Sequence, residues 1–179
     1  MIIHLKAIPL EGSRSFEFSL NEDWWQSEEP HNGQDIGLQG PVQVRLKIYR
    51  AVNKYVVEGS FEGTLRLSCD RCLRIYPEKI KNDFRVIMAP SSPDMKESEV
   101  ELAEDDMDVG LIRDEEIDAG EIVREQIYLS LPIKSLCRDD CPGLCPVCGI
   151  DLSEKTCQCN KTQGHPGFQK LKKLTVKGE

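Results

Sequence analysis

The chain of 179 residues contains no apolar run long enough to cross a bilayer, since a spanning helix needs about 20 apolar residues in succession. Its N-terminal segment also lacks the apolar stretch and the small-residue cleavage site of a signal peptide. We therefore expect a cytoplasmic protein without membrane contacts. Because thiols stay reduced in that compartment, clustered cysteines there bind metal more often than they form disulfides.

Motifs of the common catalytic classes are also missing from the sequence. The three histidines, His4, His31 and His165, are scattered, and none belongs to a zinc-hydrolase or deaminase motif. The sequence has no phosphate-binding loop, no nucleophile elbow and no dinucleotide-binding glycine pattern. Aromatic residues form only 6% of the chain, which gives little support for the stacking of nucleic-acid bases. We predict a protein that is not an enzyme and has no small-molecule substrate.

What the chain does contain is cysteine, with eight residues in four local pairs. Four thiolates at the corners of a tetrahedron are a ligand set that suits Zn2+. The segment CPVCG at 145–149 has the form of a zinc knuckle, and Gly149 can adopt the positive φ that such a turn often needs. In chain order the pairs are Cys69 and Cys72, Cys137 and Cys141, Cys145 and Cys148, and Cys157 and Cys159.

Spacing alone leaves the number of metal sites open. The most economical grouping joins the last two pairs, because the short loops between them cost little closure entropy. The first two pairs would then form a second site that ties the strands to the C-terminal segment. With a single site, Cys69 and Cys72 would be free or packing thiols. A redox role for CDRC is a minor alternative, since no βαβ setting surrounds it. We predict one or two structural zinc ions, whose binding supplies folding energy.

Most of the first 90 residues alternate between apolar and polar side chains, as half-buried strands do. Glycines at 59 and 63 continue this phase and indicate bends where a sheet curls toward a barrel. Strands joined by short turns imply an antiparallel sheet. The polar stretch from Glu22 to Gly40 is predicted to be an irregular loop. The strand patterns cover residues 13–20, 41–49, 55–67 and 84–88.

The middle of the chain is strongly acidic. Residues 91–125 contain 14 acidic and 3 basic residues, although the whole chain has a net charge of −8. The first part of this stretch, with its prolines and serines, is predicted to be a mobile, solvated linker. The alternative interpretation of these acidic residues is a mimic of nucleic-acid charge or a docking strip for a basic ribosomal-type protein.

A helix is predicted to follow the acidic segment and to pack on the sheet. Asp118, with Glu121 three residues later, can cap its first turn. Apolar residues at positions 123, 127 and 131 then form one stripe, and Pro132 ends the helix. No internal repeat is apparent in the sequence.

The C-terminal segment is basic as well as rich in cysteine. Residues 155–178 contain six lysines and no acidic residue, and a short helix is predicted from Pro166 to Leu174. Cations near the cysteines can serve as local counterions for the thiolates, or they can contact phosphates. The candidate nucleic-acid contacts are Arg71, Arg74, Lys170, Lys172 and Lys173.

Taken in order, these motifs resemble a known family. The run SLCRDDCPGLCPVCGIDLSEKTCQC, preceded by LSCDRCL and the acidic insert, is similar to the YceD-like family of bacterial large ribosomal RNA subunit accumulation proteins. The resemblance covers nearly the whole chain, and its most specific part is the pattern GLCPVCG-x-D-L. It implies a role in the accumulation or processing of large-subunit rRNA in the bacterial cytoplasm. It supplies no catalytic residues.

The sequence therefore predicts an α+β, mainly β protein in four segments. They are a β-rich domain with a CxxC motif at 1–90, an acidic linker or insert at 91–117, a helix at 118–132 and a cysteine-rich zinc module with a basic terminal helix at 133–179. The sheet should be a curved antiparallel sheet or a partial barrel with one or two helices. We predict a non-catalytic ribosome-biogenesis factor that binds large-subunit pre-rRNA or a ribosomal protein. The alternative is an acidic adaptor or chaperone for a basic ribosomal protein, without RNA contact.

Overall fold

The computed structural model describes residues 1–26, 36–91 and 109–159. The chain divides into two compact units. We call Met1–Leu67 with Tyr76–Ile133 the β-unit, and Ser68–Ile75 with Lys134–Glu179 the cysteine unit. This division groups the CxxC segment with the C-terminal cysteines, although that segment lies in the turn between two long strands.

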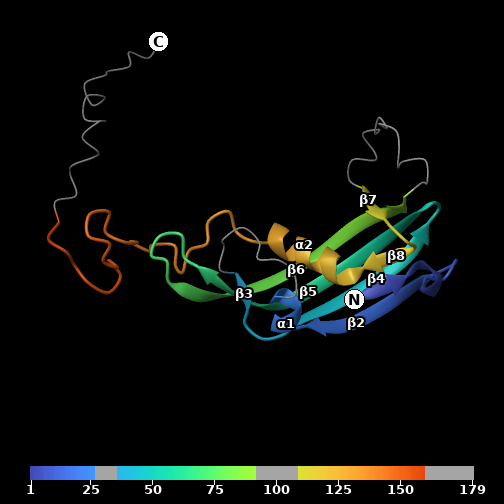
Figure 1. Ribbon diagram of the computed structural model, residues 1–179, viewed down its shortest axis with the longest axis horizontal. Helices are drawn as coiled ribbons and strands as arrows, with labels where there is room; N and C mark the ends of the chain where they lie inside the picture. Colours follow the sequence, from blue (N-terminus) through green and yellow to red (C-terminus); the bar gives the residue numbers. More distant parts are fainter. Residues whose placement is uncertain (27–35, 92–108, 160–179) are drawn as a thin grey trace, which may run out of the picture. The chain divides into compact units, whose positions relative to one another are not determined.

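The β-unit is built around a six-stranded sheet with the strand order β2-β4-β5-β6-β7, in which β3 adds to β5 beyond the end of β4 (Figure 1). The register places Phe16 of β2 opposite Leu46 of β4, and Leu46 opposite Gly59 of β5. The strands are β2 (Ser13–Leu20), β3 (Gly37–Leu38), β4 (Val42–Ala51), β5 (Lys54–Ser68), β6 (Ile75–Pro90) and β7 (Val109–Ile112).

The alternation in the sequence corresponds to the two faces of this sheet. In β4, Val42, Val44, Leu46 and Ile48 are at most 1% exposed, whereas the residues between them face solvent. Successive side chains of a strand point to opposite faces, so this pattern buries one whole side of β4. The predicted mainly β fold with a curved sheet is confirmed.

One strand pair departs from the predicted antiparallel arrangement. β6 and β7 pair in parallel, with Ile87 opposite Val109 and Pro90 opposite Ile112. A parallel pair requires a long crossover connection, and the acidic stretch between these strands has the necessary length. The prediction of a linker through residue 117 therefore missed β7, while residues 92–108 lie outside the described part of the chain.

The remaining elements form a small second sheet and short helices. Strand β1 pairs antiparallel with β8, and the helix α2 begins directly after β8. The Asp118 side chain accepts hydrogen bonds from the backbone N–H groups of Gly120 and Glu121, which confirms the predicted N-cap. The elements are β1 (Ile2–His4), η1 (Leu5–Ala7), α1 (Glu22–Gln26), β8 (Glu116–Asp118) and α2 (Ala119–Leu129).

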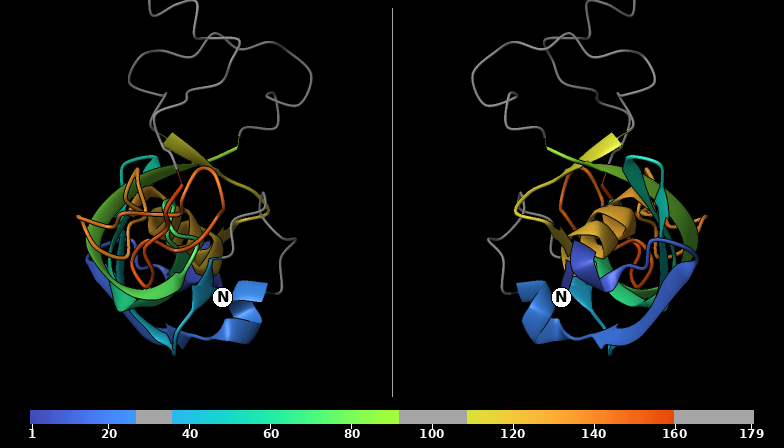
Figure 2. Two further views of the ribbon diagram at one scale, coloured as in Figure 1. Left: turned by 90° about the vertical axis from the view of Figure 1, so that its left-hand side faces the viewer. Right: turned by 90° about the vertical axis from the view of Figure 1, so that its right-hand side faces the viewer.

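α2 packs with the sheet in one apolar core. Its residues Ile122, Val123 and Ile127 share a buried cluster with Phe61 and Leu65 of β5. Figure 2 shows the strands of the β-unit curving around this helix. α2 ends at Leu129 rather than at Pro132. None of the helices in the described ranges has the length and apolar content of a bilayer span.

The stretch 22–40 was predicted to be an irregular loop, and the prediction was wrong for the part that forms α1 and β3. Trp25 is buried, and its indole N–H donates to the carbonyl of Ile36 over 2.9 Å. The buried Arg124 of α2 donates to the carbonyls of Trp24 and Trp25 over 2.8 and 2.9 Å. A residue distant in sequence thus satisfies the last carbonyls of α1, so local sequence patterns gave no signal for this helix. Residues 27–35 of the same stretch lie outside the described part.

Candidate metal centres

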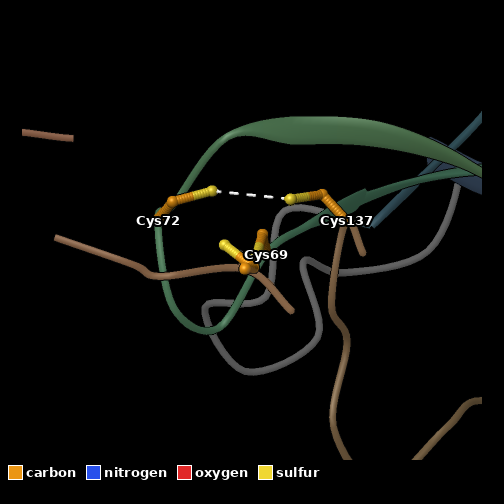
Figure 3. A group of neighbouring side chains, drawn as sticks. Cys69, Cys72 and Cys137 are labelled. Atoms are coloured by element: carbon orange, nitrogen blue, oxygen red, sulfur yellow. Dashed lines mark hydrogen bonds between the residues drawn. The ribbon is translucent and has the colours of Figure 1, made fainter. Parts of the chain in front are cut away.

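The first cysteine group consists of Cys69, Cys72, Cys137 and Cys141, and we call it site A. Its four Sγ atoms all lie within 4.8 Å of one another. The Sγ atoms of Cys72 and Cys137 are 3.8 Å apart (Figure 3), and those of Cys69 and Cys141 are 3.9 Å apart. Zinc–sulfur bonds of about 2.3 Å in a tetrahedron put the sulfurs roughly 3.8 Å apart. The spacing at site A therefore fits a tetrahedral metal site.

A tight turn after β5 presents the first two sulfurs of site A. The backbone N–H of Leu73 donates to the carbonyl of Cys69 over 2.8 Å, and the N–H of Cys69 donates to the carbonyl of Arg74 over 2.9 Å. These two bonds close the CDRC segment into a knuckle with Cys69 and Cys72 at its base. Two N–H groups and two carbonyls of the segment are thereby satisfied within the turn.

Hydrogen bonds hold the other two sulfurs of site A against this knuckle. The N–H of Asp70 donates to the carbonyl of Ser135 over 2.8 Å, and the N–H of Ser135 donates to the Asp70 carboxylate over 2.7 Å. The Arg71 guanidinium donates to the carbonyls of Cys141 and Asp139 over 2.8 and 3.2 Å. Such outer contacts fix the backbone that carries the cysteines, like the contacts that orient ligands around known metal sites.

The second cysteine group consists of Cys145, Cys148, Cys157 and Cys159, and we call it site B. Its Sγ atoms also lie within 4.8 Å of one another, and those of Cys145 and Cys157 are 3.4 Å apart. This is the grouping that the short loops favoured. Sites A and B together contain all eight cysteines of the sequence, and none of them forms a disulfide.

The knuckles of the two sites share one backbone pattern that the sequence did not reveal. In site B the N–H of Gly149 donates to the carbonyl of Cys145, and the N–H of Cys145 donates to the carbonyl of Ile150, each over 2.8 Å. Leu73 of site A and Gly149 of site B occupy the same place, with φ of 60° and 71°. Backbone hydrogen bonds do not require identical side chains, so the two knuckles share a backbone conformation without sharing the residue at this position. Glycine adopts this φ freely, whereas a leucine is strained there.

The two sites differ in their exposure to solvent. At site A, Cys69, Cys72 and Cys141 are buried, and Cys137 is half-buried. At site B only Cys145 is buried, and Cys148 is exposed. A metal ion at site B would therefore be more accessible to a chelator than one at site A.

The thiols of site A differ in pKa. Burial raises the pKa of the Cys69 thiol, but hydrogen bonding to the backbone of Cys137, Cys72 and Arg71 outweighs this and lowers it from 9.0 to about 6. Burial, together with the neighbouring sulfurs of Cys141 and Cys69, raises the pKa of Cys137 to about 12. Adjacent thiolates repel one another, so ionising the whole group requires a cation.

Site B shows the same division. Hydrogen bonding to the backbone of Cys148 and Val147 lowers the pKa of Cys145 to about 6. A hydrogen bond with Cys148, followed by burial, raises the pKa of Cys159 to about 12. Both groups therefore have the chemistry of a divalent metal site: soft donors, tetrahedral spacing and more potential negative charge than the protein alone can hold.

The two arginines predicted to contact nucleic acid have partners within the cysteine unit. Arg71 donates to backbone carbonyls beside site A, as described above. The Arg74 guanidinium pairs with the carboxylates of Asp151 and Glu154 over 2.7 and 3.0 Å. RNA contact by either arginine stays a prediction. The remaining candidates, Lys170, Lys172 and Lys173, lie outside the described residues.

The sequence analysis missed the residues that position the cysteine-bearing segments. Asp70 lies between the cysteines of CDRC, and Asp151 is the aspartate of the G-x-D-L pattern. Hydrogen bonding to the backbone N–H of Ser153, and then to Arg74, lowers the pKa of Asp151. The place of Asp151 in a specific motif was the available signal, but its partner, Arg74, lies 77 residues earlier in the chain.

Relatives of the chain occur in plants and mycobacteria. A protein of Arabidopsis thaliana named large ribosomal RNA subunit accumulation protein YCED homolog 1, chloroplastic, is 26% identical over 75% of this chain and 48% of its own length. A Zea mays protein of the same name is 26% identical over 73% of this chain and 57% of its own length. An uncharacterized Mycobacterium tuberculosis protein is 31% identical over 70% of this chain and 61% of its own length.

The chain thus spans about half to three fifths of the length of these relatives. No solved structure shows a significant match to it. The family described as "Large ribosomal RNA subunit accumulation protein YceD" matches residues 57–175. That range is more than half of the chain and includes all eight cysteines of sites A and B. The chain therefore belongs to the YceD family of large ribosomal RNA subunit accumulation proteins.

Proposed function

We propose that this protein is a non-catalytic ribosome-biogenesis factor that promotes the accumulation or processing of large-subunit rRNA. We further propose that two structural zinc ions hold its cysteine unit together. The observation that carries the proposal is the gathering of eight cysteines, all within the range matched by the family, into two four-sulfur groups.

Zinc is the metal that fits these groups best. Sites made only of thiolates, with tetrahedral spacing, favour Zn2+ or iron–sulfur centres over the hard cations. Zinc, when bound, would supply a charge that neutralises adjacent thiolates and a rigid link between distant segments. Asp70 and Arg71 would keep the ligand-bearing backbone in place, as their hydrogen bonds indicate.

The ligand set supports a structural rather than a catalytic role. A catalytic zinc ion keeps one position open for water or substrate, whereas four cysteines fill a tetrahedron. A protein of this kind would act by binding. The names of the plant relatives support large-subunit rRNA accumulation as the process. The partner would be large-subunit pre-rRNA or a ribosomal protein, in the cytoplasm of the cell.

The metal part of the proposal is tested by one cysteine variant per site. We expect about two zinc ions per chain, falling to about one in C72S and in C148S, because three remaining thiols hold zinc weakly. Elemental analysis of protein prepared without oxygen measures this. Metal content that is unchanged in both variants would contradict the proposed ligands.

The functional part is tested in cells that depend on this protein. We expect wild-type protein to restore mature large-subunit rRNA, and C72S to leave precursor rRNA in excess. Equal restoration by both proteins would contradict a role for site A in this process.

Binding of purified protein to large-subunit rRNA over a salt series then identifies the partner. Steep salt dependence that is lost when Lys170, Lys172 and Lys173 are changed to Glu supports RNA contact. If the purified protein does not bind rRNA even at low salt, the result would favour the alternative function, an acidic adaptor for a basic ribosomal protein.

A further inference from the structure

The backbone of the site A knuckle is hydrogen-bonded to the start of site B. The N–H of Leu144, the residue before Cys145, donates to the carbonyl of Arg71 over 3.0 Å. Gly143 has a φ of 73°, and a Cβ atom on it would lie 2.9 Å from the same carbonyl oxygen. Only glycine allows the two backbones to approach so closely with this φ. The first link between the sites is therefore built into the backbone.

A side chain provides the second link. Arg74 lies two residues after Cys72, and its partners Asp151 and Glu154 lie in the loop between Cys148 and Cys157. The Asp151 carboxylate is 20% exposed, whereas that of Glu154 is 64% exposed. The partly shielded pair with Asp151 is the stronger of the two, since exposed ion pairs contribute little.

The two links are joined within site B. Leu144 and Asp151 face each other in an antiparallel β-bridge, and the N–H of Leu152 donates to the carbonyl of Gly143 over 3.0 Å. Contacts thus run from Arg71 to Leu144, across the bridge to Asp151, and back to Arg74. The loop that closes site B is held against the site A knuckle at two connected points.

We propose that sites A and B bind their metal ions cooperatively, and that Arg74 is the residue that couples them. Metal at site B fixes the loop that carries Asp151, and this loop holds Arg74 and the knuckle of site A in place. Coupling between sites is reciprocal, so metal at site A favours binding at site B by the same factor. Each filled four-thiolate site carries a formal charge of −2, and the Arg74 cation beside site A would reduce the repulsion between two such sites. The inference rests on the metal binding proposed above.

The test compares the zinc affinity of site A with site B intact and with site B disabled. C148S disables site B at an exposed ligand, which leaves the buried sulfurs of the unit unchanged. Competition with a chromophoric zinc chelator gives the affinity, and alkylation of free thiols shows which cysteines are protected. We expect C148S to weaken zinc binding at site A about fivefold, the lower end of typical coupling between sites. In R74Q, disabling site B should change the affinity of site A by less than about twofold.

R138Q is the matched control. Arg138 belongs to the same unit and lies beside the site A ligand Cys137, but its ion pair, with Asp140, does not reach the site B loop. The full fivefold effect of C148S should remain in R138Q. A second measurement needs no cysteine variant: chelator titration of the full chain gives the zinc affinities of its two sites, and D151N should weaken zinc binding at site B by up to about fivefold while the first binding event at site A keeps its affinity.

The outcomes separate this inference from the proposed function. Equal affinity of site A with and without site B, in protein with Arg74, would overturn cooperativity and leave two structural metal ions standing. Full coupling in R74Q would overturn the assignment to Arg74. Failure of either site to bind zinc in the wild-type chain would instead overturn the metal part of the proposed function.

Discussion

The β-unit and the cysteine unit achieve order by different means. The β-unit buries Phe61, Leu65 and Ile127 in a continuous apolar core. In the cysteine unit the buried residues include Cys69, Cys141 and Cys145, while large apolar side chains such as Leu73 and Val147 are exposed. Residues 134–159 form turns and one β-bridge, between Leu144 and Asp151. This range contains no helix and no strand of more than one residue. A short segment without an apolar core commonly depends on metal or disulfides for its fold.

Removal of metal should separate the behaviour of the two units most strongly. A strong chelator should disorder the cysteine unit and leave the β-unit folded, because structural zinc contributes about 10–16 kcal/mol in small zinc-dependent peptides. Amide hydrogen exchange measures both units in one sample: protection should be lost for the amides of Cys69 and Cys145 and kept in β4. Unchanged protection in the cysteine unit would contradict the account.

The reverse experiment removes apolar packing from the β-unit. F61A, at a side chain that is 2% exposed, should lower the free energy of unfolding of this unit by roughly 3–5 kcal/mol. Denaturant titration measures the loss, and zinc content per chain should not change. L10A, at a side chain that is 77% exposed, is the control, with an expected change within about 0.5 kcal/mol. Loss of zinc in folded F61A would show that the two units are not independent.

A third prediction concerns pH and follows from the lowered thiol pKa values. Cys69 and Cys145, with pKa values of about 6 instead of 9.0, are thiolates at pH 8 and offer no proton for metal to displace. Cys137 and Cys159, at about 12, are protonated at that pH and must release protons on binding. Below pH 6 the low-pKa thiols also gain protons, which zinc must then displace. The logarithm of zinc affinity should therefore fall more steeply as the pH falls, with a slope that increases by about one for each site.

Zinc affinity measured by chelator competition from pH 5 to 8 tests the prediction. A constant slope across pH 6 would contradict it.

The smallest expected effect distinguishes the two knuckles from each other. G149A should destabilise zinc-bound protein by about 1–2 kcal/mol, because alanine is strained at a φ of 71°. L73G at the matching position should instead relieve strain and raise the affinity of site A by a smaller amount. Zinc competition measures both changes. Effects of the same sign would show that the knuckles are not equivalent.

The sequence predicted those features that depend on neighbouring residues. The alternation in β4, the Asp118 cap of α2 and the short loops of site B are all local, and each appears in the structure as expected. The features that were missed depend on distant partners. α1 relies on Arg124, and the loop of site B relies on Arg74. The grouping of Cys69 and Cys72 with Cys137 and Cys141 joins segments about 65 residues apart, so spacing left it as one of two alternatives.

The central claim is that metal bound by eight thiolates replaces an apolar core in the cysteine unit. The most direct measurement is the zinc content of freshly purified full chain, kept without oxygen, together with the hydrogen exchange of residues 134–159. We predict about two zinc ions per chain and protected amides in this range. A metal-free chain with the same protected amides would contradict the claim.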